Sequence, residues 1–127
     1  MYFILLCTDR EAAEKYYPLG LNISRLHKRD YKICSIEGLL KDRYDYKQVI
    51  RLSIPNDERL LMQKSSRNET LYETNMIFVE QIYSLNNIET VKYFIDLGVS
   101  ADIMMKNLAI ISNPENLKLL KTIKQSV

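Results

Sequence analysis

The chain has 127 residues, of which 46% are hydrophobic and 27% are charged, and it contains three glycines and three prolines. These proportions are typical of a globular protein and exclude a long flexible linker. The 18 basic and 16 acidic residues give a net charge of only +2, whereas nucleic-acid-binding domains usually concentrate a basic excess. We therefore expect one compact unit.

The apolar opening of the chain, residues 1–7, is followed at once by charged residues. It is too short for a signal peptide with its cleavage site, or for a membrane span. Cys7 and Cys34 do not make a disulfide framework, and two reduced thiols are favoured over one bridge. We therefore predict a cytoplasmic protein with no membrane partner.

The front half of the sequence predicts β-strands. Ile50, Leu52 and Ile54 alternate with other side chains, which is the period-two pattern of a strand. Two earlier segments are rich in β-favouring residues. The predicted strands lie at residues 2–7, 31–36 and 48–54.

From residue 75 onward the hydrophobic spacing changes and predicts helices. The asparagine pair at residues 86–87 is suited to an N-cap, and Gly98 to the left-handed residue that closes a helix. Asn113, Pro114 and Glu115 form a second start signal. Four apolar stripes at helical spacing are Phe78, Val79, Ile82 and Leu85; Ile88, Val91, Phe94 and Ile95; Met104, Leu108 and Ile111; and Leu117, Leu120 and Ile123.

Residues 86–102, with the sequence NNIETVKYFIDLGVSAD, resemble the second helix and following turn of an ankyrin repeat. Residues Tyr17, 20–23 (GLNI), Cys34, 38–39 (GL) and 54–57 (IPND) resemble the N-terminal domain of ankyrin-repeat proteins of giant DNA viruses of amoebae. This chain looks like a short member of that group. For a viral protein, the predicted compartment is the host cell cytoplasm.

The predicted fold class is α+β, with a small strand-rich N-terminal cap followed by two ankyrin-like antiparallel helix pairs. The cap is assigned to residues 1–72 and the helical repeats to residues 73–127, packed as one compact unit. Stacked repeats of this kind present a continuous surface for binding.

No catalytic constellation is found, so we predict a protein that is not an enzyme, with no cofactor and no metal. His27 is the only histidine, and no zinc-ligand set of familiar spacing can be written around it. A nucleophilic pair of Cys34 and His27 is conceivable, but a buried thiol and a loop histidine are the favoured interpretation.

The resemblance implies binding to a protein partner through the turns and the inner helix face. The candidate contact residues are Ser100, Asp102, Lys106 and Asn107, which are polar and lie beside an apolar stripe. The last helix has no polar capping repeat after it, so self-association through the C-terminal helices is also predicted.

The alternative function is nucleic-acid binding. The segment 25–32 interleaves four basic residues with Tyr31, which suits phosphate contacts and base stacking. The last helix carries Lys118, Lys121 and Lys124 on one face. The net charge of only +2 disfavours this alternative, and we do not expect a nucleic-acid partner.

Overall fold

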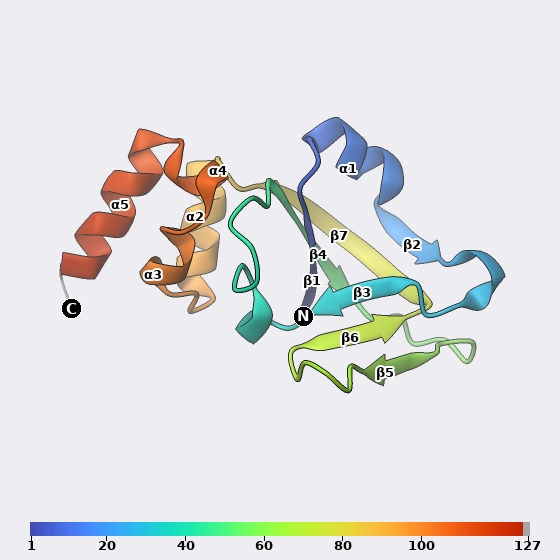
Figure 1. Ribbon diagram of the computed structural model, residues 1–127. Helices are drawn as coiled ribbons and strands as arrows, with labels where there is room; N and C mark the ends of the chain where they lie inside the picture. The colour runs from blue at the N-terminus through green and yellow to red at the C-terminus, as the bar shows by residue number, and fades with distance from the viewer. Residues whose placement is uncertain (126–127) are drawn as a thin grey trace.

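The computed structural model describes residues 1–125, which form an antiparallel β-sheet with a group of helices at one end (Figure 1). Within these residues the sheet has seven strands in the order β2-β7-β4-β1-β3-β6-β5. The strands are β1 (Tyr2–Leu6), β2 (Gly20–Ile23), β3 (Tyr31–Cys34), β4 (Gln48–Ser53), β5 (Met62–Lys64), β6 (Leu71–Thr74) and β7 (Met76–Ser84).

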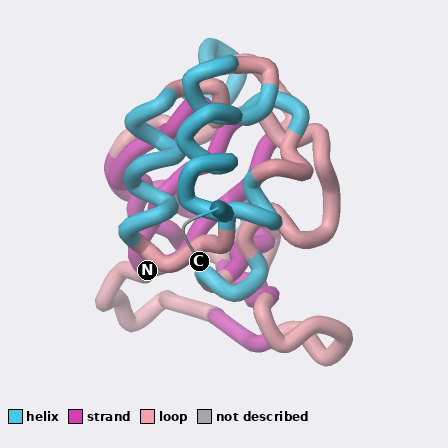
Figure 2. The backbone as a smooth tube through the Cα atoms, turned by 90° about the vertical axis from the view of Figure 1, so that its left-hand side faces the viewer, coloured by secondary structure: helices cyan, strands magenta, loops and turns pink. Residues whose placement is uncertain are grey.

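The helices fall into two groups. One short helix follows β1, and the others come after the last strand and lie together at one end of the sheet. Figure 2 looks onto that end, with the helices in front of the strands. The helices are α1 (Arg10–Tyr16), α2 (Ile88–Asp96), α3 (Ala101–Met104), α4 (Leu108–Ile111) and α5 (Pro114–Gln125), and single 3-10 turns lie at Arg25–His27 and Ile36–Gly38.

The central strands are buried on both faces of the sheet. Phe3 and Val49 pack into a core that includes Phe94 of α2, whereas the next residues along the chain, Ile4 and Ile50, pack into a second core. Successive side chains of a strand point to opposite faces, so each strand supplies both cores. The second core also contains Ala13 of α1, so α1 and the C-terminal helices belong to opposite faces.

The predicted helix pairs are wrong. The segment expected to form the first helix is β7, the longest strand among the described residues, and it pairs with both β2 and β4. The sheet therefore continues to Ser84, and β6 crosses the boundary drawn after residue 72. The observed architecture is an extended antiparallel sheet with short helices, not a stack of helical repeats.

A β-bulge explains why the spacing of hydrophobic residues in β7 resembles that of a helix. Arg51 is opposite Gln81 and Leu52 is opposite Val79, so Glu80 is an extra residue on β7. The extra residue changes the spacing of the core-facing side chains from two to three, because Val79 and Ile82 share one core. A strand with such a bulge imitates helical spacing over a short window.

The predicted start and stop signals of the helices are confirmed. The side chain of Asn87 accepts a hydrogen bond from Glu89 N, and Gly98 has a φ of +93° just after α2. The Asn113 side chain accepts from Glu115 N at 3.0 Å at the start of α5. These signals depend on local chemistry, so the tertiary context does not alter them.

The stripe predicted from Met104 to Ile111 does not form, because α3 and α4 are separate helices. Residues 105–107 separate the two helices, and Asn107 is the N-cap at which α4 begins. The restart changes which residues face inward. Met104 and Ile110 are buried, while Leu108 is 59% exposed.

Candidate interaction surfaces

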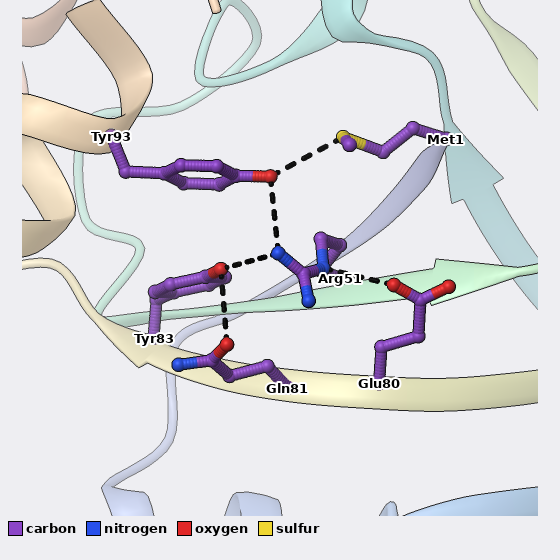
Figure 3. Close-up of polar contacts among 6 residues, drawn as sticks. All are labelled: Met1, Arg51, Glu80, Gln81, Tyr83 and Tyr93. Carbon is purple, nitrogen blue, oxygen red and sulfur yellow. Dashed lines mark hydrogen bonds and ion pairs between the residues drawn. The ribbon is translucent and has the colours of Figure 1, made fainter. Parts of the chain in front are cut away.

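A cluster around Arg51 joins the sheet to α2 (Figure 3). The rings of Tyr83 on β7 and Tyr93 on α2 are stacked, with centroids 5.0 Å apart. The Arg51 guanidinium lies 5.8 Å from each ring centroid and donates to both hydroxyls, at 2.9 Å to Tyr83 and 3.4 Å to Tyr93. Its Nε pairs with Glu80 at 3.0 Å.

This cluster fixes the orientation of α2 on the sheet. The hydrogen bond to the Tyr93 hydroxyl raises the pKa of Arg51 above its ordinary value. Burial is the main cause of the raised pKa of the Tyr83 phenol. The Tyr83 hydroxyl donates to Gln81 at 3.2 Å. Nothing in the sequence indicates Tyr93 as the partner of Arg51.

Three of the four predicted contact residues are exposed in or next to α3, namely Ser100, Asp102 and Lys106. Asp102 forms an ion pair with Lys124 of α5 at 2.8 Å, and this pair lowers the pKa of Asp102. The Ser100 side chain caps α3 by accepting from Ile103 N at 3.2 Å. Lys106 is exposed just after α3.

Asn107 is different, because only 1% of it is exposed. Its side-chain oxygen accepts from Ile110 N at 2.9 Å, and its amide donates to the carbonyl of Tyr46 at 3.0 Å. Asn107 therefore ties α4 to the loop before β4. We assign it this structural role and leave it out of the contact surface.

The structure adds Leu108, which sequence spacing had placed in the core. Its exposed side chain borders a hollow of about 420 Å³ between α4 and the ends of the central strands. The Leu108 amide donates to the carbonyl of Tyr44 at 2.8 Å, which holds the residue in place. We call the surface of Ser100, Asp102, Lys106 and Leu108 the α3–α4 corner.

The thiol of Cys34 is poorly suited to nucleophilic chemistry. It contributes to a hollow of about 550 Å³ between β3 and the loop after it. Burial raises its pKa to about 12, so the thiol is protonated at neutral pH. His27 is exposed in the turn after β2, and both cysteines are free.

Among residues 1–125, no three His, Cys, Asp or Glu side chains come together as a metal-binding group. No helix in that part of the chain has the length and apolar character needed to cross a bilayer.

The two basic segments of the nucleic-acid alternative lie at opposite ends of the molecule. Residues 25–30 form the connection from β2 to β3, whereas α5 lies in the helical group at the other end of the sheet (Figure 1). Tyr31 packs against Tyr17, with ring centroids 6.4 Å apart. The two segments therefore do not form one binding surface.

The outer face of α5 is polar rather than apolar. Lys118, Lys121 and Lys124 are exposed, whereas Leu120 is buried. The large hydrophobic residues that are exposed in the described part of the chain lie on other elements. Among the described residues of the C-terminal helices, Leu108 of α4 is the large hydrophobic residue that is exposed, and self-association through these helices stays a prediction.

The fold and these surfaces define a small sheet domain with a helical corner fastened to one end. The chain is 42% identical over 111 residues to a protein of Acanthamoeba polyphaga mimivirus that is named as an ankyrin repeat protein. The match covers 87% of this chain and 36% of the relative, so the chain spans about a third of the relative's length. This match supports the resemblance to ankyrin-repeat proteins of giant amoebal viruses. No family model and no solved structure matches the chain.

Proposed function

We propose that this chain is a non-enzymatic protein-interaction module of a giant-virus protein, acting in the host cytoplasm. The similarity to the mimivirus ankyrin repeat protein over most of this chain is the observation that carries the proposal. The protonated Cys34 thiol is consistent with a role other than nucleophilic catalysis.

The α3–α4 corner is the proposed contact surface. It offers charged groups of both signs, at Asp102 and Lys106, next to the exposed Leu108. Apolar side chains inside a polar rim are the usual make-up of a protein interface. Met104 and Asn107, which alternate with these residues along the chain, are buried and anchor this segment, which reduces the entropy lost on binding.

The test is capture of partners from an Acanthamoeba lysate by the tagged chain. A variant with Ser100, Asp102, Lys106 and Leu108 replaced by alanine is expected to lose the captured protein while keeping its fold. The matched control replaces exposed residues at the other end of the molecule, Arg25, Lys28, Arg29 and Glu58. Unchanged recovery with the corner variant, or equal loss with both variants, would remove this assignment.

A further inference from the structure

The outer edge of β7 is only half covered by a neighbouring strand. β4 pairs with β7 along its length, from Phe78 to Ser84, whereas β2 pairs only with Met76–Val79. β2 begins at Gly20, which has a φ of +96°, and its pairing with β7 does not extend to the residues before Gly20. The stretch 80–84 therefore has a strand partner on one side only.

The hydrogen-bond register shows which backbone groups face this open edge. Leu85 N donates to the carbonyl of Lys47 at 2.9 Å, so Leu85 and, by alternation, Tyr83 face β4. Ile82 and Ser84 then face outward. The Ser84 carbonyl accepts from Asn87 N at 3.1 Å, which leaves the N–H and C=O of Ile82 and the N–H of Ser84 directed at the edge.

A groove runs along this edge. One hollow of about 420 Å³ is bounded by Glu14 and Leu19 on the α1 side, and a second of about 290 Å³ is bounded by Glu89 at the start of α2. Both hollows are lined by Arg10, Gln81 and Ile82. The two hollows therefore adjoin each other beside the open edge of β7.

We propose that this groove binds a short extended segment of a partner protein as an added β-strand, in line with β2. Main-chain hydrogen bonds to Ile82 and Ser84 supply the pairing, as in other cases of strand addition. An unpaired edge is a ready template for another chain unless it is blocked. Here β2 and α1 flank the edge without occupying it.

The charges of the groove select a basic segment. Its lining contains three carboxylates, from Glu14, Glu80 and Glu89, against the single guanidinium of Arg10. Each carboxylate has a basic partner: Glu14 pairs with Arg10 at 2.8 Å, Glu80 with Arg51 at 3.0 Å and Glu89 with Lys92 at 3.6 Å. The pairs of Glu14 and Glu89 are exposed and therefore weak, so these two carboxylates can exchange partners with an incoming lysine. Tyr17 and Leu19 add apolar surface at one end. An extended peptide that alternates lysine with an aliphatic residue matches both features. This site is separate from the α3–α4 corner, so either assignment can fail without the other.

The experiment titrates the full chain with the hexapeptide Ac-VKVKVK-amide and follows amide hydrogen exchange by NMR. The Ile82 and Ser84 amides are expected to gain roughly tenfold or greater protection, while the Tyr83 and Leu85 amides, already in the ladder, change little. A version N-methylated at every residue and the Val-Glu analogue Ac-VEVEVE-amide are expected to bind more weakly. Equal binding by the fully N-methylated peptide, or no binding by any peptide, would overturn the proposal.

A charge variant tests the selectivity. Glu14→Gln with Glu89→Gln is expected to weaken binding of the lysine peptide roughly threefold. The matched pair Glu58→Gln with Glu115→Gln, both exposed and away from the groove, is expected to leave it unchanged. Equal effects of the two pairs would contradict the charge argument. Protection of Ile82 and Ser84 that rises with protein concentration in the absence of peptide would show that a second copy of this chain is the occupant, and would likewise overturn the proposal.

Discussion

Glu80 is the extra residue of the β-bulge in β7. Its carboxylate pairs at 3.0 Å with Arg51 of β4, the residue next to the register shift. The bulge therefore places an acid where it orients the arginine that contacts α2. The sheet and the first of the C-terminal helices are joined at this point, through the stacked rings of Tyr83 and Tyr93.

Replacing Arg51 is expected to loosen this junction. Arg51→Ala removes two hydrogen bonds to hydroxyls and two cation–π contacts, and we expect it to lower the free energy of unfolding by about 1–2 kcal/mol after allowance for partial exposure. Urea denaturation measures this change. Arg59→Ala is the control, because Arg59 pairs only with nearby Asp57 on the surface. Equal stability of the two variants would show that the Arg51 cluster does not hold α2 to the sheet.

Removing Phe94 tests whether the helices and the sheet share one core. Phe94 is fully buried, and its ring meets that of Phe3 edge to face at 6.3 Å. Phe94→Ala is expected to cost about 3–5 kcal/mol, whereas Phe78→Ala, at a position 46% exposed, is expected to cost less than about 1 kcal/mol. Unfolding followed by circular dichroism and by tyrosine fluorescence should give coincident transitions. Two separate transitions would contradict a shared core.

The neighbours Lys106 and Asn107 are expected to respond in opposite ways. Asn107→Ala removes a helix cap and a buried bond to the Tyr46 carbonyl, so we expect a loss of about 2 kcal/mol. Lys106→Ala should change stability little, because its side chain is exposed. Thermal unfolding of both variants measures the difference. A destabilised Lys106 variant beside a stable Asn107 variant would reverse the assignment of roles.

The Cys34 thiol is expected to resist modification and to weaken the fold at alkaline pH. Burial raises its pKa from 9.0 to about 12. Between those values the unfolded chain releases the thiol proton and the folded chain keeps it, so stability falls as pH rises above about 9. At about pH 8, iodoacetamide should label the partly exposed Cys7 before Cys34. Mass spectrometry of the labelled peptides measures how fast each cysteine is labelled. Faster labelling of Cys34 than of Cys7 would be inconsistent with the burial of Cys34.

The sequence predicted the features that depend on neighbouring residues. The strands at the front of the chain and the helix starts at Asn87 and Asn113 follow from period-two spacing and from capping chemistry. Other features depend on contacts between distant residues. The bulge at Glu80 exists because β7 pairs with Arg51, 29 residues earlier in the chain, and it gave the strand a helical spacing.

The same distinction applies to the candidate surfaces. Ser100, Asp102 and Lys106 are exposed as their polarity suggested, but Asn107 is polar and buried because it bonds to a carbonyl far away in the sequence. Leu108 is apolar and exposed because the helix restarts just before it. Polarity alone does not reveal a residue whose burial depends on a distant partner.

Site-specific photocrosslinking tests the proposed function most directly. With p-benzoylphenylalanine in place of Lys106, irradiation in an Acanthamoeba lysate is expected to yield a defined crosslinked protein, which is absent when the same group replaces the exposed Glu58 in the loop between β4 and β5. The crosslink should be lost when Leu108→Ala is added. No crosslink from position 106, or the same product from both positions, would contradict binding through the α3–α4 corner.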